Sequence, residues 1–262
     1  RHGARSAVAP WDDPLSIRYM EVMKEASELG LDLDRLFHPD LPDHERLAIF
    51  DWFRAVHQSV RIPMAYAIPT AEAVHIIGQF SPIVEIGAGS GYWSRLIRER
   101  TGSIVFAYDK SPCLGVHRCD HIPTIIESHP DCSLFLCWPD QSDMASTAIN
   151  AFGGEIFIYI GESIGRTVHG DFSPMGDVAF HLYVNRHFHE VLRVPLPNWP
   201  GNQDCLSVYK RSGAITLMMG ETGNVETFQH VPPSERSDLF TASELGWRIL
   251  DKTADMIASS NT

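Results

Sequence analysis

The sequence predicts an α/β fold built on a mostly parallel sheet with helices on both faces. Between residues 83 and 188, short apolar runs of strand length alternate with segments whose apolar residues recur at helical spacing. This alternation is typical of parallel strands, because each parallel neighbour needs a crossover that a helix supplies. A glycine-rich bend, Gly87–Gly91, joins the first run to a helix. Two last runs, 188–196 and 205–210, are joined by a turn rich in proline and asparagine, which predicts an antiparallel pair at the end of the sheet.

Seven runs are expected to form the sheet. They are Ile83–Ile86, Ile104–Tyr108, Ile122–Ile126, Ser133–Trp138, Glu155–Ile160, Phe188–Leu196 and Cys205–Lys210. Helices are expected from Tyr92 onward, over Met144–Ala151 and over Val178–Phe188. The region between Asp109 and the third run is too short for a full crossover helix.

Two helices are expected in the N-terminal region. Apolar residues from Leu15 to Leu29 follow helical spacing, and Gly30 can end that helix. A second helix is expected after Pro42-Asp43, with one apolar face. The residues of that face are Leu47, Phe50, Phe53, Val56 and His57. These helices either cover a pocket or pack on the edge of the sheet, since amphipathic periodicity reports burial and not function.

The ends of the chain and the approach to the first strand give further expectations. A short helix over 71–80 is expected just before the first strand, with Thr70 as its N-cap. Residues 1–13 are expected to be a tail. Beyond the last strand of the sheet the pattern weakens, with one more strand over 215–219 and a helix within 241–257.

Composition and charge limit the classes of function. The 262 residues are 44% apolar and 21% charged, as in an ordinary globular protein, and can form one large domain with additions. The formal charge of −12 disfavours a nucleic-acid partner, because phosphate contacts need clustered Lys and Arg. No apolar run approaches the roughly 20 residues of a membrane-spanning helix, so no membrane partner is expected. The oligomeric state does not follow from the sequence.

The cysteines favour a reducing compartment. They are five in number, an odd count, and lack disulfide-like spacing, so a cytoplasmic protein is expected. Cys113, His117, Cys119 and His121 lie within nine residues and include the atoms of a possible zinc site. The paired C-x-x-C of a typical structural zinc site is missing, so no metal is expected.

The bend after the first strand has the chemistry of a binding site. Gly87, Gly89 and Gly91 alternate along it, and glycine tolerates positive φ and lets another group approach the backbone. The following helix aims its free N–H groups and positive dipole end at the bend, where a carboxylate or phosphate is the natural occupant. A dinucleotide-binding bend needs a small residue where this chain has Tyr92.

Glu85 stands two residues before the first glycine, and the stretch resembles the first motif, E/D-x-G-x-G-x-G, of the class I S-adenosylmethionine-dependent methyltransferases. The resemblance covers about residues 66–211. It implies a Rossmann-like seven-stranded sheet, with S-adenosylmethionine as cofactor and S-adenosylhomocysteine as product. It also implies an acid after the second strand that binds the ribose hydroxyls, and Asp109 stands there, 18 residues beyond Gly91. NAD-binding folds use such an acid too, so Asp109 alone does not choose between the cofactors.

The resemblance divides the chain into three parts: a helical extension or cap over 1–65, a cofactor-binding core over 66–211 and an appendage over 212–262. The cofactor-binding residues that it implies are Glu85, Gly87, Ala88, Gly89, Gly91, Asp109, Lys110, Cys137, Trp138 and Pro139. Thr70, beside the bend, is a further candidate for the amino acid end of the cofactor, although capping is the common role of a threonine before a helix.

The end of the fourth strand departs from the family pattern. Methyltransferases that act on amine or amide nitrogen often carry D/N-P-P-Y/F there, and this chain has Trp138-Pro139-Asp140-Gln141. Trp138 can lay its ring against a sulfonium or a cationic acceptor, or it can pack in the core. Glu162, after the fifth strand, and Asp140 are candidates for a base that removes a proton from the acceptor. His169 lies in the same loop as Glu162 and is another candidate.

Three alternatives stay open. An NAD-dependent oxidoreductase is disfavoured by Tyr92 and by the terminal strand pair. A non-catalytic scaffold is suggested by the departure at residues 138–141, and a sensor that binds S-adenosylmethionine without using it fits the same residues. For an enzyme, a small-molecule acceptor is the leading expectation and a protein side chain the second, because this fold hosts many kinds of acceptor.

Overall fold

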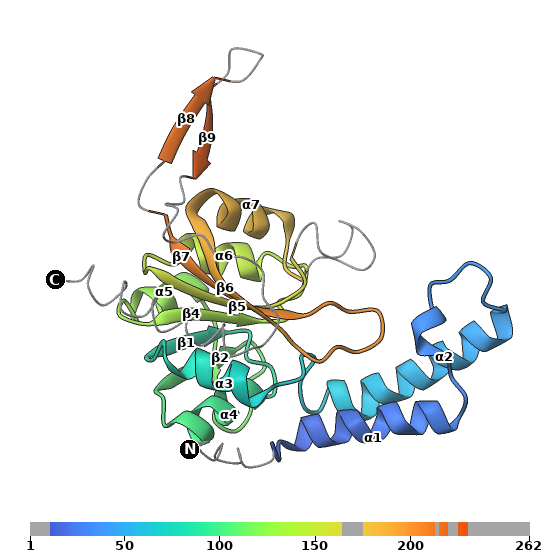
Figure 1. Ribbon diagram of the computed structural model, residues 1–262. Helices are drawn as coiled ribbons and strands as arrows, with labels where there is room; N and C mark the ends of the chain where they lie inside the picture. The colour runs from blue at the N-terminus through green and yellow to red at the C-terminus, as the bar shows by residue number, and fades with distance from the viewer. Residues whose placement is uncertain (1–10, 164–174, 213–214, 220–224, 230–262) are drawn as a thin grey trace, which may run out of the picture.

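A computed structural model describes residues 11–163, 175–212, 215–219 and 225–229. Its centre is a seven-stranded sheet with the order β3-β2-β1-β4-β5-β7-β6 (Figure 1). The strands are β1 (Ile83–Ile86), β2 (Val105–Asp109), β3 (His117–Arg118), β4 (Ser133–Cys137), β5 (Ile156–Gly161), β6 (Phe188–Pro195) and β7 (Cys205–Arg211). The strands from β3 to β5 are parallel, and β7 is antiparallel to both β5 and β6. The predicted fold class, with its terminal antiparallel pair, is confirmed.

The strand order reverses beside β1. From β1 the chain passes to β2 and β3 on one side and then crosses to β4 and β5 on the other. Glu85 on β1 therefore has Ala107 of β2 and Phe135 of β4 as its neighbours. In open α/β sheets ligands bind outside the carboxyl ends of the strands at such a reversal. The residues that follow β1, β2, β4 and β5 therefore lie along one edge of the sheet.

Helices cover both faces of the sheet (Figure 1). They are α3 (Ala71–Gly78), α4 (Tyr92–Thr101), α5 (Ile122–Glu127), α6 (Met144–Ala151) and α7 (Val178–His187). One core packs α3 and α4 on the sheet, and a second core packs α5, α6 and α7 on the other face. Strand β4 shows the division, since Phe135 lies in the first core and Leu134 and Leu136 in the second.

The third strand is not where the sequence predicted it. The run Ile122–Ile126 belongs to the helix α5, and the third strand is His117–Arg118. Pro123 lies in the first turn of α5, where a missing N–H breaks no helical hydrogen bond. His121 Nδ1 accepts the Thr124 N–H at 3.3 Å and caps the helix. Capping and proline therefore outweigh the strand preference of the β-branched isoleucines.

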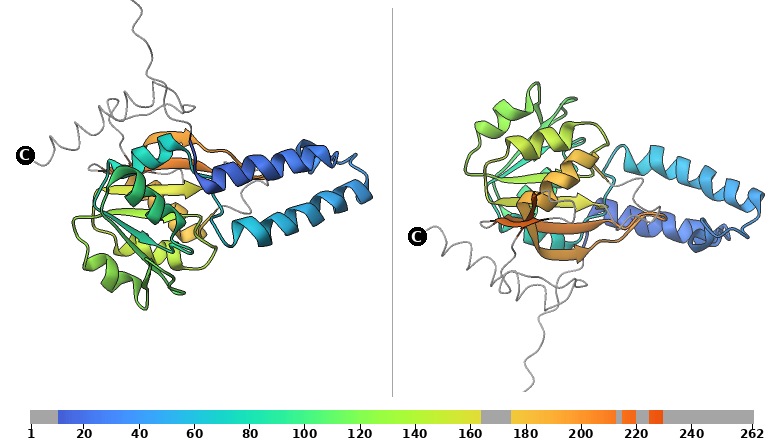
Figure 2. Two further views of the ribbon diagram at one scale, coloured as in Figure 1. Left: turned by 90° about the horizontal axis from the view of Figure 1, so that it is seen from below. Right: turned by 90° about the horizontal axis from the view of Figure 1, so that it is seen from above.

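The N-terminal helices form an arm that extends away from the sheet (Figures 1 and 2). Helices α1 (Pro14–Glu28) and α2 (Asp43–Val56) lie side by side, joined by a loop that contains the short 3-10 helix η1 (Leu33–Arg35). At its end α2 continues directly into the π-helical turn η2 (His57–Arg61). Both helices occur where the sequence predicted them, and η2 brings the chain back to the edge of the sheet.

The predicted apolar face of α2 is wrong at Leu47 and Phe50, whereas Val56 and Phe53 of that face pack in the first core. Leu47 and Phe50 are 63% and 48% exposed, whereas Ile49 is buried. Ile49 packs with Leu36 and Leu41 in a small core of the arm. A helix that leaves the body of a domain contacts few neighbours, so it buries a narrow stripe and leaves its other apolar residues at the surface.

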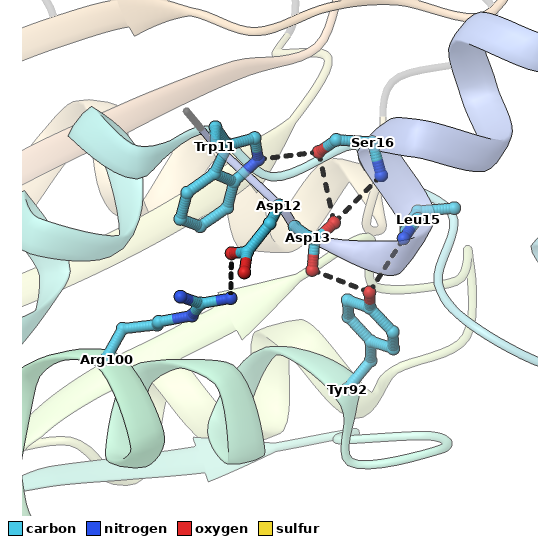
Figure 3. Close-up of polar contacts among 7 residues, drawn as sticks. All are labelled: Trp11, Asp12, Asp13, Leu15, Ser16, Tyr92 and Arg100. Atoms are coloured by element: carbon cyan, nitrogen blue, oxygen red, sulfur yellow. Dashed lines mark hydrogen bonds and ion pairs between the residues drawn. The ribbon is translucent and has the colours of Figure 1, made fainter. Parts of the chain in front are cut away.

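The base of the arm is tied to the helix that follows the glycine bend (Figure 3). Asp13 is fully buried, and its Oδ2 accepts the Ser16 N–H at 2.8 Å. Its Oδ1 accepts the hydroxyl of Tyr92 at 2.7 Å. The same hydroxyl oxygen accepts the Leu15 N–H at 2.9 Å. Tyr92 therefore fixes the start of α1 against the start of α4.

Arg100 of α4 completes this attachment. Its guanidinium pairs with Asp12 at 2.5 Å and lies 5.4 Å from the centre of the Trp11 ring. The Trp11 Nε1–H donates to the Ser16 hydroxyl at 2.8 Å. The prediction of a tail over residues 1–13 is thus wrong for 11–13, because three side chains in this segment have fixed partners.

The C-terminal part begins with a separate pair of strands. Strands β8 (Ile215–Met219) and β9 (Val225–Gln229) form a two-stranded antiparallel sheet, which confirms the strand predicted over 215–219. The helix predicted within 241–257 lies outside the described residues. The division of the chain at residues 65 and 211 remains a prediction. Among the described helices, none combines the length and apolar character that crossing a membrane requires.

Candidate functional site

Three neighbouring cavities lie along the carboxyl edge of the parallel strands. The bend cavity, about 140 Å³, lies against the glycine bend. The Asp109 cavity, about 420 Å³, lies between the ends of β2 and β4. The arm cavity, about 320 Å³, lies between the arm and the end of β5. Trp138 lines the first two, and Arg61 lines both the bend cavity and the arm cavity.

The three glycines of the bend serve two purposes. Gly87, Gly89 and Gly91 have left-handed φ angles of 77°, 54° and 70°. A Cβ at Gly87 would lie 2.7 Å from Met144 Sδ, and one at Gly91 would lie 2.6 Å from Val116 Cγ2. These two positions therefore permit close packing. A Cβ at Gly89 would meet no atom within 4 Å, so Gly89 is where a side chain would compete with a ligand.

Glu85 is the acidic residue of the bend cavity. It is 1% exposed, and burial raises its pKa to about 7. Its Oε2 is buried and has no hydrogen-bond partner among the described residues. Such an oxygen is costly to bury, and a cation or hydrogen-bond donor in the cavity would satisfy it. The predicted cofactor residues that line this cavity are Glu85, Gly87, Ala88, Gly89, Cys137 and Trp138.

Asp109 connects the bend to the next cavity. Its Oδ2 accepts the Gly89 N–H at 2.8 Å and its Oδ1 accepts the Ser111 N–H at 2.8 Å. Each oxygen retains a lone pair for another donor. Asp109 thus shapes the bend and faces the Asp109 cavity at the same time. The predicted residues that line this cavity are Gly87, Asp109, Lys110, Trp138, Pro139 and Asp140.

Trp138 lies between these two cavities in a strained conformation. Its φ is 52°, which costs a non-glycine residue about 1–2 kcal/mol. Its Nε1–H donates to Asp204 Oδ1 at 2.8 Å, and its ring stacks on Tyr66 with centroids 5.0 Å apart. The guanidinium of Arg61 lies 4.9 Å from the ring centre. Strain of this kind persists where neighbours impose it, and it clusters at functional sites.

Thr70, Gly91 and Cys137 complete the predicted cofactor residues. Thr70 Oγ1 accepts the Ala73 N–H at 3.1 Å and caps α3, the common role weighed for it from the sequence. Gly91 donates its N–H to Ala88 O at 2.8 Å and precedes the first turn of α4. Burial raises the pKa of the Cys137 thiol, so the thiol stays protonated at neutral pH and is a poor nucleophile.

The predicted base Glu162 lies in the arm cavity and not with Asp140. Glu162 is 2% exposed, and its Oε1 accepts the Gln203 N–H at 2.6 Å and the Asn202 amide at 3.3 Å. Apolar residues of the arm line the same cavity. They are Leu36, Phe37, Phe50 and Phe53. The structure therefore separates the two predicted bases, with Asp140 beside Asp109 and Glu162 beside the arm.

Sequence reasoning missed two charged residues of this edge, Arg61 and Asp204. Asp204 is 1% exposed, its Oδ2 has no partner among the described residues, and burial raises its pKa to about 7. Because β7 runs antiparallel, the residue before it lies at the carboxyl edge of the parallel strands, and this signal could have identified Asp204. Arg61 is 5% exposed, and burial lowers its pKa. Nothing in its local sequence marks it.

The other candidates from the sequence were His169 and the segment from Cys113 to His121. His169 lies outside the described residues. Within the described part of the chain, no group of three potential metal ligands comes together, and this includes the segment from Cys113 to His121.

Comparisons with known proteins add little to this geometry. No family model matches the chain, and no curated protein matches it. Among solved structures, a mutant of MtNAS is 15% identical, with a TM-score of 0.31 over 76% of this chain and 78% of that one. The Burkholderia thailandensis 1,6-didemethyltoxoflavin-N1-methyltransferase, with bound 1,6-didemethyltoxoflavin and S-adenosylhomocysteine, is 15% identical, with a TM-score of 0.34 over 80% of this chain and 98% of that one. At such scores neither likeness bears on function.

The class of this protein is therefore defined by its own fold and cavities and not by the comparisons. It has a Rossmann-like, mostly parallel seven-stranded sheet with a terminal antiparallel pair, and a row of cavities along the carboxyl edge of its parallel strands.

Proposed function

We propose that this protein is an S-adenosylmethionine-dependent methyltransferase that acts on a small molecule. The observation that carries the proposal is Glu85, which lines the cavity beside the glycine bend and whose buried Oε2 has no hydrogen-bond partner within the described part of the chain. The cofactor ends in an amino acid, and its ammonium group is the donor that this oxygen needs. The N-terminal end of α4 suits the carboxylate of the same amino acid.

The remaining residues of the edge fit the rest of the cofactor. Asp109 keeps a lone pair on each oxygen for the two ribose hydroxyls. The Asp109 cavity, about 420 Å³, falls in the size range of small-ligand sites and suits a nucleoside. Lys110, Pro139 and Asp140 would contact that nucleoside, and Gly89 leaves room for the chain that joins it to the amino acid.

Bound S-adenosylmethionine supplies a methyl group that its sulfonium has already activated. The chain's own residues then align the acceptor and exclude water. Glu162 lies in the neighbouring arm cavity, where it can accept a proton from an acceptor hydroxyl or amine. Asp204 holds the indole N–H of Trp138 and thereby fixes the ring between the cavities. We infer that Asp204 is a positioning residue and that Glu162 is the base.

Calorimetric titration with S-adenosylhomocysteine, and separately with NAD, tests the proposal. We expect micromolar binding of S-adenosylhomocysteine and none of NAD. Gly89→Leu should abolish that binding, because its side chain fills the space for the ligand. Gly102→Leu is the matched control, since Gly102 also has a left-handed φ, 71°, and open space around its Cβ position. Normal binding by the Gly89 variant would show that the bend is only a turn.

A turnover assay with S-adenosylmethionine and candidate acceptors then separates an enzyme from a sensor. A protein that binds S-adenosylmethionine but forms no S-adenosylhomocysteine with any acceptor would be a sensor. Failure to bind either nucleotide would favour a scaffold, and the departure at residues 138–141 would be the first place to examine.

A further inference from the structure

The arm cavity combines flat apolar surfaces with two charged groups. Phe37, Phe50 and Phe53 come from the arm, and Arg61 and Glu162 come from the two chain segments beside it. A cavity of about 320 Å³ takes a small molecule rather than a protein segment. The aromatic side chains favour an occupant with a flat apolar body.

Arg61 lacks the anion that its burial calls for. It is 5% exposed, its Nε has no hydrogen-bond partner, and no ion pair to it occurs within the described residues. Its guanidinium carbon lies 4.9 Å from the Trp138 ring centre and 5.1 Å from that of Tyr66. The Trp138 and Tyr66 rings are stacked on each other with their centres 5.0 Å apart. The guanidinium therefore lies beside these two rings and not between them. Its two terminal nitrogens donate no hydrogen bond to any described residue, so their N–H groups remain for a ligand in the cavities that Arg61 lines.

Asp204 does not fill this role. It stabilises the charged form of Arg61 at a distance, but the two form no ion pair. Its Oδ1 already accepts the Trp138 indole N–H. Burying the charge of a guanidinium without a direct anionic partner costs free energy. A carboxylate that accepts two hydrogen bonds from the guanidinium would offset most of that cost.

The cofactor does not need Arg61 either. In the proposed binding mode Glu85 meets the ammonium group, and the N-terminal end of α4 meets the carboxylate of the cofactor. Arg61 also contacts Phe53 of the arm, 5.6 Å from the ring centre, and so belongs to the arm cavity as much as to the bend cavity.

Glu162 supplies the second polar contact. Its Oε1 is occupied by Gln203 and Asn202, and its Oε2 has no hydrogen bond among the described residues. A carboxylate in that position favours a hydroxyl or amine, which can donate a hydrogen bond and then its proton. Arg61 therefore selects for a carboxylate, and Glu162 selects for a hydroxyl or amine, in the same ligand.

We propose that the methyl acceptor is a small aromatic carboxylate, whose carboxylate binds Arg61 and whose hydroxyl or amine faces Glu162. This inference rests on the proposed methyltransferase function. The acceptor oxygen or nitrogen forms a bond to the methyl carbon while the carbon–sulfur bond breaks. The electron pair of that bond stays on sulfur, and the acceptor's proton passes to Glu162.

The test compares matched acceptors on the full chain in the presence of S-adenosylhomocysteine. The probes are 3- and 4-hydroxybenzoate and 3- and 4-aminobenzoate, each with its neutral amide. Calorimetry should show that at least one carboxylate binds at least about tenfold more tightly than its own amide, because only the carboxylate forms charge-assisted hydrogen bonds. Mass spectrometry with S-adenosylmethionine should then find that acceptor methylated.

Arg61→Gln should remove the preference for the carboxylate and leave affinity for S-adenosylhomocysteine within about twofold. Arg54→Gln is the control, because it removes the same charge from an exposed position on α2. Circular dichroism would confirm that both variants fold. The titrations also use 5′-methylthioadenosine, which lacks the amino acid end of the cofactor.

Each result decides between the two proposals. If S-adenosylhomocysteine does not bind the unaltered protein, the methyltransferase proposal fails. If it binds, but no carboxylate binds more tightly than its amide, the acceptor inference is wrong and the cofactor assignment stands. If Arg61→Gln lowers the affinity for S-adenosylhomocysteine but not that for 5′-methylthioadenosine, Arg61 binds the carboxylate of the cofactor. The acceptor inference is then also overturned.

Discussion

Replacing Glu85 by glutamine should make the protein more stable and weaken its binding of S-adenosylhomocysteine. The pKa of Glu85 is about 7 in the folded chain, against an ordinary 4.5, because burial disfavours the charged carboxylate. The contribution of Glu85 to the free energy of unfolding is therefore most favourable below about pH 4.5, where the side chain is neutral in both the folded and the unfolded state. That stability is lost as the pH rises through about 7.

The size of the effect follows from the two pKa values. The difference between about 7 and 4.5, at 1.36 kcal/mol for each tenfold change, corresponds to roughly 3 kcal/mol. Glutamine has the shape of the neutral acid and does not ionise. Glu85→Gln should therefore raise the free energy of unfolding by about 3 kcal/mol at pH 8 and change it little at pH 4. It should also lower the affinity for S-adenosylhomocysteine at least about tenfold, since the ammonium group of the ligand loses the carboxylate that pairs with it.

Urea denaturation at pH 4 and pH 8 measures the first effect, and calorimetry at pH 8 the second. Glu99→Gln is the control, because Glu99 is an exposed carboxylate on α4 and its loss changes the net charge equally. A variant that gains stability and loses affinity would identify Glu85 as a residue kept for binding at a cost in stability. The reasoning is refuted if Glu85→Gln is less stable than the unaltered protein at pH 8, or if it binds S-adenosylhomocysteine equally well.

Two further predictions concern Tyr92 and Asp109. Tyr92→Phe should lower the free energy of unfolding by about 1–3 kcal/mol, because Asp13 and the Leu15 N–H lose their buried partner; urea denaturation measures this. Tyr183→Phe is its control, and an equal loss in both variants would contradict the role of the hydroxyl. Asp109→Ala should weaken S-adenosylhomocysteine at least about tenfold in calorimetry, because the ribose loses its acceptor and the bend its Gly89 contact. Unchanged affinity would remove Asp109 from the site.

The residues of the bend and of the neighbouring strand ends could be predicted because their signal is local. Glu85 and the three glycines lie within seven residues of one another, and their types alone indicate a strand, a turn with positive φ and a helix. Asp109 follows the next strand, and parallel strands end at one edge, so its place beside the bend follows from the order of elements.

The predictions for the third strand and for the face of α2 were wrong where the conformational preference of single residues differs from what their neighbours in the fold impose. Three isoleucines between residues 122 and 126 favour a strand, but the helix cap at His121 and the proline at 123 determine the conformation. On α2, Leu47 and Phe50 have helical spacing, yet the direction in which the arm leaves the sheet decides that they stay exposed. Periodicity shows that a helix has an apolar face but not what covers it.

By itself the sequence determined six of the seven strands of the sheet, the bend and the positions of Glu85 and Asp109, because backbone conformation depends on residues close together in the chain. Tertiary structure alone decided what Tyr92, Arg61 and Asp204 do. Tyr92, read from the sequence only as too large for a dinucleotide bend, binds Asp13 and fixes the arm. Arg61 and Asp204 come from distant segments, and their pKa values are shifted because other parts of the chain exclude water from them. Burial of a charge depends on the whole fold, and no short pattern records it.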